Sequence, residues 1–226
     1  MSRYIVATIK DWNLSAFDRF HRSLPGRWQL VTSPGALEDL LDLGYNPRYI
    51  FFPHWSWKVP GKIFDEYECV CFHCADVPYG RGGSPVQNLI ERGHHETKLT
   101  ALRMVEELDA GPVYLKKPFP LEGNAQEIFE RMSSEIYQLI REIVANEPVP
   151  VEQQGESVVF SRRTPSQSAL PSKGSIAKLF DHIRMLDADS YPRAFLDHGE
   201  FRLTFRDPIL LAEDRLEARM EVVQRD

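Results

Sequence analysis

Apolar residues along the chain form short β-branched or aromatic runs, separated by stretches with helical spacing. The runs at 4–9, 28–31, 49–52 and 69–73 are typical of buried strands. Between them, Leu14 and Phe17 recur at helical spacing, and a second helix is predicted to begin at Ser33–Pro34 and end at Gly44. This strand–helix–strand order predicts parallel strands covered by helices, the α/β class.

The clearest helix is predicted between Asn124 and about residue 146. Asn124 is a good N-cap, and Glu127 three residues later completes a capping box. Apolar positions then follow at helical spacing until Pro148 and Pro150 end the pattern: Ile128, Met132, Ile136, Leu139, Ile140 and Ile143. This stripe predicts a helix packed on the core, with no role in binding a cofactor.

The pattern changes after residue 150. Residues 151–172 are rich in Ser, Gln and Pro around one short predicted strand at 158–160, and a short helix is predicted at about 175–186. Alternating segments at 201–205 and 215–223 predict antiparallel strands. We therefore expect a Rossmann-like, mostly parallel sheet flanked by helices in residues 1–150. A small β-rich C-terminal appendage is expected in residues 151–226.

Composition and charge narrow the class of partner. The 226 residues carry 27 basic and 33 acidic side chains, a net charge of −6, which argues against a nucleic-acid partner held through its phosphates. No apolar run reaches the roughly 20 residues of a membrane helix, and no signal peptide is evident. Three cysteines do not make a disulfide framework. These features predict a cytoplasmic protein without a membrane partner.

Residues 69–111 hold the richest set of reactive side chains. His73 follows a predicted strand, and ligands of open parallel sheets bind outside the carboxyl ends of strands. Cys69, Cys71, His73 and Cys74 are residue types that bind zinc, but three of them lie along one extended strand and no second pair follows, so no metal is expected. The glycines at 80–83 lack the spacing of a P-loop or dinucleotide site, so a phosphate site there is a weak alternative.

A family resemblance is carried by His73, Pro78, Arg81–Gly82 and Pro85, followed by residues 108–112. This block resembles the formyltransferases that use 10-formyltetrahydrofolate, including the 36 positions from His73 to Asp109. Further similarity lies in 55–60 (WSWKVP), 162–165 (RRTP) and 190–195 (SYPRAF). The resemblance implies three groups of site residues. The catalytic group is His73, Asp109 and Cys71; the folate-binding group is Trp55, Trp57, Lys58, Val59, Leu108 and Gly111; the substrate-binding group is Tyr79, Arg81 and Gly82.

The resemblance also implies a mechanism and one departure from it. Formyl transfer to an amine needs a hydrogen-bond donor at the formyl oxygen and a group that moves a proton, roles that fit His73 and Asp109. Cys71 stands where the family has asparagine, and a thiol is a much weaker donor than an amide. The Asn88 amide is a second candidate donor, and formylation of the Cys71 sulfur is a further alternative.

The expected acceptor is a nucleotide-linked amino sugar, a UDP- or dTDP-4-amino-4,6-dideoxyhexose used in polysaccharide biosynthesis. The chain length, the acidic charge and the tail segments favour this reading. The alternatives are a methionyl-tRNA formyltransferase-like enzyme, or a non-catalytic folate- or nucleotide-binding relative. The predicted tail strands have edges that can pair, so a homodimer is expected.

Overall fold

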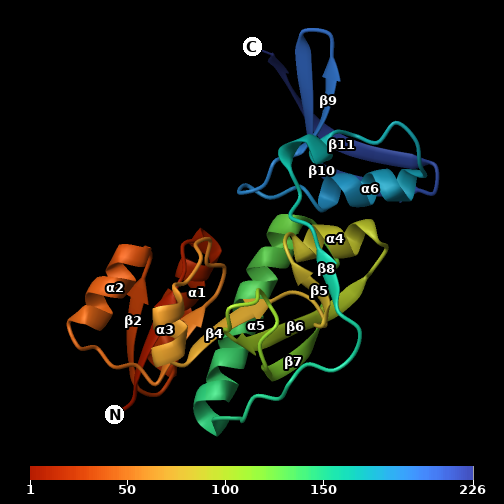
Figure 1. Cartoon of the computed structure of the whole chain (residues 1–226). Helices are drawn as coiled ribbons and strands as arrows, with labels where there is room; N and C mark the ends of the chain where they lie inside the picture. Colours follow the sequence, from red (N-terminus) through yellow and green to blue (C-terminus); the bar gives the residue numbers. More distant parts are fainter. Residues whose placement is uncertain (226) are drawn as a thin grey trace. The chain divides into compact units, whose positions relative to one another are not determined.

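A computed structural model describes residues 1–225 (Figure 1). The chain divides into two compact units. The first comprises Met1–Arg81, Lys98–Phe119 and Glu130–Val159, and the second comprises Gly82–Thr97, Pro120–Phe129 and the residues from 160 onward. The domain boundary that we expected at residue 150 stays a prediction.

A six-stranded sheet organises the first unit. Its order is β2-β1-β3-β4-β6-β7, with bounds β1 Arg3–Ala7, β2 Arg27–Val31, β3 Tyr49–Phe52, β4 Cys69–His73, β6 Glu96–Arg103 and β7 Val113–Pro120. β1 lies parallel to both β2 and β3, and β3 lies parallel to β4. β6 runs antiparallel to β4. The predicted α/β class with a mostly parallel sheet is confirmed.

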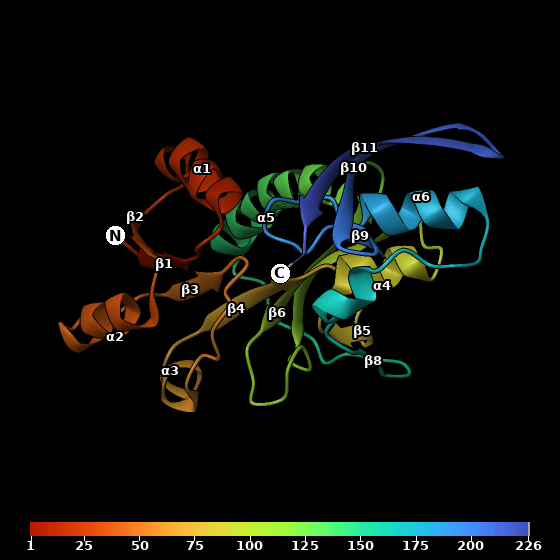
Figure 2. The same cartoon turned by 90° about the horizontal axis from the view of Figure 1, so that it is seen from above.

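Helices cover both faces of this sheet. Figure 2 shows α1 (Asp11–Phe20) and α5 (Ala125–Asn146) on one side, and α2 (Pro34–Asp42) and α3 (Gly61–Glu66) on the other. The side of α2 and α3 encloses an apolar cluster that includes Ile5, Leu37, Ile50, Phe52 and Ile63. Alternate residues of each strand enter this cluster because successive side chains of a strand point to opposite faces.

The helix ends follow the predicted signals. The Ser33 side chain accepts a hydrogen bond from the Ala36 amide, at 3.2 Å, at the start of α2. At α5, the Asn124 amide donates to Glu127 and the Glu127 amide donates to Asn124, each at 2.9 Å, which is a complete capping box. The described helices include none that is long and apolar enough to cross a membrane.

The second unit contains α4 (Pro85–Glu91), α6 (Ile176–Arg184) and a separate three-stranded sheet. The strands are β9 (Ala194–His198), β10 (Phe201–Ala212) and β11 (Arg215–Gln224), and both neighbours pair antiparallel to β10. This confirms the small antiparallel C-terminal sheet. Short elements complete the chain: 3-10 helices at His21–Ser23 and Pro165–Ser168, and a two-stranded sheet of β5 (Tyr79–Gly82) and β8 (Val158–Phe160).

Candidate active site

His73 is the last residue of β4 and is almost completely buried. Its Nε2 lies 2.7 Å from the carbonyl oxygen of Gly80, and its Nδ1 lies 3.4 Å from Oδ2 of Asp109. Since a carbonyl oxygen only accepts, Nε2 carries a proton and donates it to Gly80. The arrangement therefore fixes the ring and places its Nδ1 edge beside a carboxylate.

Asp109 follows β6 in the connection to β7 and has a positive backbone angle, φ 55°. Such a conformation is uncommon for a residue with a side chain, and strained residues of this kind cluster at functional sites. Gly111, two residues on, lies against β6: a Cβ atom there would be 1.8 Å from the carbonyl oxygen of Arg103. Only glycine fits at 111, so the turn that presents Asp109 depends on it.

Cys71 shares a face of β4 with His73, two residues away, and packs against the apolar cluster of the first unit. Burial, followed by the nearby charge of Asp109, raises the pKa of the Cys71 thiol well above its ordinary value. The thiol is therefore neutral at physiological pH. A neutral thiol is a poor nucleophile and a weak hydrogen-bond donor, so this environment does not favour a formylated sulfur.

The predicted folate-binding residues lie on two loops. Trp55 and Trp57 follow β3, with ring centroids 4.9 Å apart, and Trp57 is 45% exposed. Lys58 Nζ on this loop lies 2.8 Å from Oε1 of Glu106, on the loop that leads to Asp109. Leu108 on that second loop is also exposed. The ion pair spans the two loops that carry these exposed apolar side chains.

Other predicted residues are placed differently. Val59 is buried in the apolar cluster, where it packs as a core residue. Tyr79 begins β5 and is half-buried, and Gly82 ends the same strand with φ 96°. The Arg81 guanidinium is within 3.2 Å of Oε1 of Glu107, and it also reaches Gln153, a residue that the sequence did not single out.

An open hollow of about 630 Å³ is lined by residues 1–3, 46–48 and 66–68. These segments lie at the amino-terminal ends of β1, β3 and β4, whereas His73 lies at the carboxyl end of β4. His73 and Asp109 are not among its lining residues, so the hollow is separate from the candidate site.

Comparison with known proteins identifies the family of this chain. A family model described as the C-terminal domain of methionyl-tRNA formyltransferase matches residues 165–223. The solved structure of methionyl-tRNA formyltransferase from Clostridium thermocellum is 39% identical, with a TM-score of 0.93, over 99% of this chain and 100% of that chain. The chain belongs to the formyltransferase family.

More distant formyltransferases are similar to parts of the chain. The curated methionyl-tRNA formyltransferase of Mesoplasma florum is 28% identical over 64% of this chain, which spans about half (48%) of that relative. A sugar N-formyltransferase from a Shewanella species shares the fold, with a TM-score of 0.67 and 14% identity, over 86% of this chain and 92% of that one.

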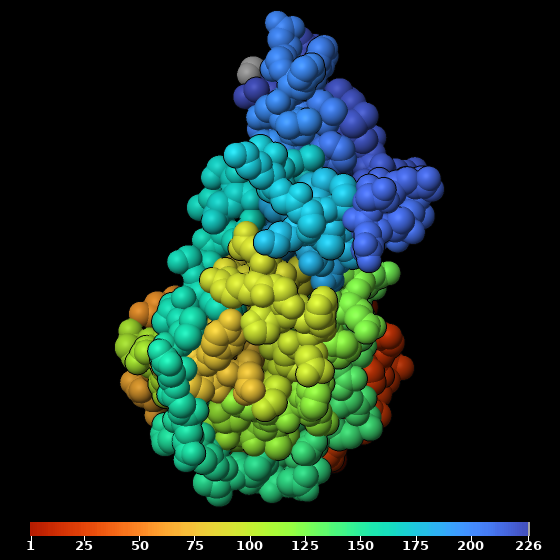
Figure 3. All heavy atoms as spheres, turned by 90° about the vertical axis from the view of Figure 1, so that its right-hand side faces the viewer, coloured from red at the N-terminus to blue at the C-terminus, as the bar shows by residue number. Residues whose placement is uncertain are grey.

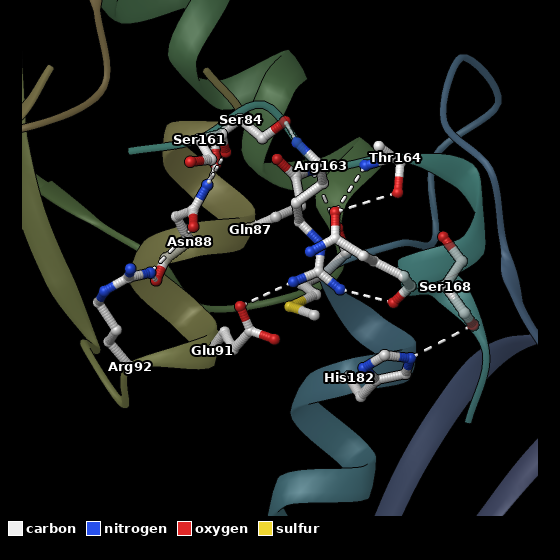
Figure 4. A network of polar contacts seen from close by, with 12 residues as sticks. Ser84, Gln87, Asn88, Glu91, Arg92, Ser161, Arg163, Thr164, Ser168 and His182 are labelled. Atoms are coloured by element: carbon white, nitrogen blue, oxygen red, sulfur yellow. Dashed lines mark hydrogen bonds and ion pairs between the residues drawn. The ribbon is translucent and has the colours of Figure 1, made fainter. Parts of the chain in front are cut away.

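In this member of the family, the Asn88 amide does not take the place of the family's asparagine. It lies on α4 in the second unit, and its Nδ2 is within 3.1 Å of the carbonyl oxygens of Gly83, Ser84 and Ser161 (Figure 4). Its Oδ1 accepts from Arg92 at 2.9 Å. Because both amide hydrogens are used by the chain itself, Asn88 holds the loop before α4.

The tail segments that resemble the family meet at this same loop before α4. The Arg163 amide and the Tyr191 hydroxyl both donate to Oγ of Ser84, at 3.2 and 3.0 Å. The Arg163 guanidinium pairs with Glu91 of α4 at 2.7 Å, as Figure 4 shows. These residues therefore connect α4 to the C-terminal sheet region within the second unit.

Among residues 1–225, no group of three or more His, Cys, Asp or Glu side chains is placed to hold a metal ion. Cys69, Cys71 and Cys74 are free cysteines.

Proposed function

We propose that this chain is an enzyme that transfers the formyl group of 10-formyltetrahydrofolate to a primary amine. The observation that carries the proposal is the contact between His73 Nδ1 and the Asp109 carboxylate at the carboxyl end of β4. Membership of the formyltransferase family supports it. The position of the site at the carboxyl end of a strand in a mostly parallel sheet supports it too, because ligands of such sheets bind there.

The two side chains have distinct roles in this proposal. An attacking amine must lose a proton, and the Asp109 carboxylate, still partly exposed, is the acceptor for it. Because Nε2 of His73 is held by Gly80, only the Nδ1 edge of the ring faces Asp109 and the reactants. The amine nitrogen bonds to the formyl carbon to give a tetrahedral intermediate. The bond from that carbon to the folate nitrogen then breaks, and the proton that Asp109 took from the amine is returned to that departing nitrogen.

The surroundings suit a folate co-substrate, which supplies the activated formyl group. A pteridine ring is flat and partly apolar, so it packs well against exposed apolar side chains. Trp57 and Leu108 are such side chains, and they lie on the two loops that the Lys58–Glu106 ion pair spans. We propose that these loops hold the co-substrate beside Asp109. The Trp55 ring packs edge to face against the Trp57 ring and so fixes its position.

We propose methionyl-tRNA as the first acceptor to test, because the 39% identical relative carries that name. This reverses the order expected from the sequence, in which a nucleotide-linked amino sugar came first. The nucleotide-linked amino sugar stays the second candidate. The net charge of −6 disfavours binding to the many phosphates of a tRNA, whereas a sugar nucleotide carries only two phosphate groups.

The test is an acceptor panel. The purified chain is incubated with 10-formyltetrahydrofolate and either methionyl-tRNA or UDP- and dTDP-linked 4-amino sugars, and release of tetrahydrofolate is followed. Turnover with one acceptor class, lost in His73→Ala, supports the enzyme and identifies the acceptor. Folate binding without turnover on any amine supports a non-catalytic relative instead.

We also propose that the chain forms a homodimer through its C-terminal sheet. The β9–β11 pairing places Leu196, Phe201, Met220 and Val222 on one face, since directly opposed residues of antiparallel strands share a face. All four are between 44% and 52% exposed. A second copy of the chain would cover this apolar face.

A further inference from the structure

The segment 151–159 runs along the first unit, close to the candidate site. Val151 exchanges backbone hydrogen bonds with Val113 of β7, at 2.7 and 2.9 Å. The Val158 amide donates to the carbonyl oxygen of Pro78, at 3.1 Å. The segment is therefore attached at both ends, and Figure 3 shows this part of the chain as a turquoise band on the surface.

Gln153 is the residue of this segment that turns inward. Its neighbours Glu152 and Gln154 are exposed, whereas Gln153 is half-buried. Its Nε2 donates to the carbonyl oxygens of Asp109 and Gly111, each at 2.8 Å. Its Oε1 accepts from Nε and Nη2 of Arg81, at 3.0 and 2.9 Å.

These four contacts use the whole hydrogen-bonding capacity of one amide. A glutamate at 153 would keep the Arg81 contacts but place a carboxylate oxygen against two carbonyl oxygens. A methionine would keep the length of the side chain and lose every contact. Glutamine therefore matches both sides of the site at once: the turn that carries Asp109, and the guanidinium of Arg81.

The contacts act on a backbone that needs support. Asp109 has φ 55°, a conformation that persists only when its surroundings impose it. Gln153 holds the carbonyl groups of Asp109 and Gly111, one on each side of Ala110. Fixing these two groups fixes the direction of the Asp109 side chain toward His73.

We propose that Gln153 is a positioning residue for formyl transfer, which acts by holding the Asp109 turn and the Arg81 guanidinium in place. This inference rests on the function proposed above. A misplacement of a reacting group by about 1 Å costs on the order of a hundredfold in rate. Gln153→Met is therefore expected to lower kcat by about 10- to 100-fold, while the KM for 10-formyltetrahydrofolate changes less than about threefold.

Two further variants separate positioning from stability. Gln154→Ala, the exposed neighbour of the same residue type, is the matched control and is expected to keep the wild-type kcat. In Gln153→Glu, protonation of the carboxyl restores a donor, so its kcat relative to wild type is expected to rise as the pH falls from 8 to about 5. A merely structural residue would not give this pH dependence.

A measurement without substrates tests the inference independently of the proposed function. The ring-nitrogen NMR signals of His73 report its contact with Asp109, and they are expected to shift in Gln153→Met and to stay in place in Gln154→Ala. If the wild type transfers no formyl group but these signals shift, the proposed function fails and the positioning role stands. Unchanged His73 signals, or an unchanged kcat in a folded Gln153→Met protein, would overturn the inference.

Discussion

The left-handed backbone of Asp109 makes asparagine the most informative replacement at this position. Asparagine is among the residues that best tolerate positive φ, and it has nearly the same size as aspartate. Asp109→Asn is expected to keep the fold and to lower kcat by about 10²- to 10⁴-fold, because the amide does not accept the amine proton. Steady-state kinetics and a thermal melt measure the two effects.

The control for this variant is Glu107→Gln, which also removes one negative charge. Glu107 lies two residues before Asp109 and is the exposed partner in the ion pair with Arg81. It is expected to keep kcat within about threefold, since exposed ion pairs contribute little. Equal kcat values for Asp109→Asn and Glu107→Gln would show that the Asp109 carboxylate takes no part in the reaction.

His54 gives a second prediction, on stability against acid. It follows β3 with φ 52°, and its Nδ1 accepts from Nδ2 of Asn13 at 2.9 Å. Burial, together with Lys10, lowers the pKa of His54 to about 4. Since the folded pKa lies below the unfolded value of about 6.5, His54 stabilises the fold above pH 6.5, and this contribution is lost as the pH falls through about 4.

The replacement His54→Asn removes the titration and keeps an acceptor oxygen and a residue that tolerates positive φ. The loss in the free energy of unfolding between pH 7 and pH 4 is expected to shrink by up to about 3 kcal/mol relative to wild type. Urea denaturation at both pH values measures it. The exposed His198 provides the control His198→Asn, which should change nothing; an undiminished acid loss in His54→Asn would contradict the assignment.

Single residues of the site were predictable to different degrees. His73 and Asp109 were singled out because a motif with fixed spacing contains them, and the structure places the two side chains in contact. Gln153 carried no signal: it lies in a Ser-, Gln- and Pro-rich segment, and its contacts reach 42 to 72 residues back along the chain. Such contacts depend on the path of the chain in space, which local pattern does not encode.

At the scale of elements, the turn after β6 depends on Gly111. A methyl group there would meet the backbone of Arg103, which is fixed in the sheet and has no room to move aside. Gly111→Ala is expected to destabilise the fold by about 1–3 kcal/mol and to displace Asp109, lowering kcat by at least about tenfold.

Gly35 of α2 is the matched control for this substitution, since an added Cβ would meet nothing within 4 Å. Gly35→Ala is expected to leave kcat unchanged and to stabilise the helix by up to about 1 kcal/mol. Thermal melts of both variants, with kinetics, decide the matter. A Gly111→Ala protein as stable and active as Gly35→Ala would show that the turn can relax.

Elements with a strong period were predicted well. The runs at 49–52, 69–73 and 158–160 match β3, β4 and β8, and the capped stripe of α5 is found with its predicted ends. β6 and β7 were missed because their sequences mix apolar with charged residues, as in ETKLTALR and VYLKKPFP. α3, with six residues, is too short to show a period. The antiparallel direction of β6 is set by how the chain returns to the sheet, which the local sequence pattern does not encode.

For the whole molecule, the apolar face of the C-terminal sheet predicts self-association. Its register places Met220 opposite Phe205 and Val222 opposite Leu203, so apolar side chains continue across β10 and β11 on one face. The other face pairs Thr204 with Glu221 and Arg206 with Arg219, and its apolar side chains are Phe195 and Val223. The first face therefore gains more free energy by leaving water, at about 25 cal/mol for each Å² of apolar surface.

Met220→Glu places a charge on this apolar face and is therefore expected to convert a dimer to a monomer, because a charge buried without a partner is costly. Glu221→Gln changes a side chain on the polar face and is expected to leave the dimer intact. Sedimentation velocity at micromolar concentration measures both, with kcat as a check that the first unit is unaffected. A wild-type chain that sediments as a monomer would contradict the proposed homodimer.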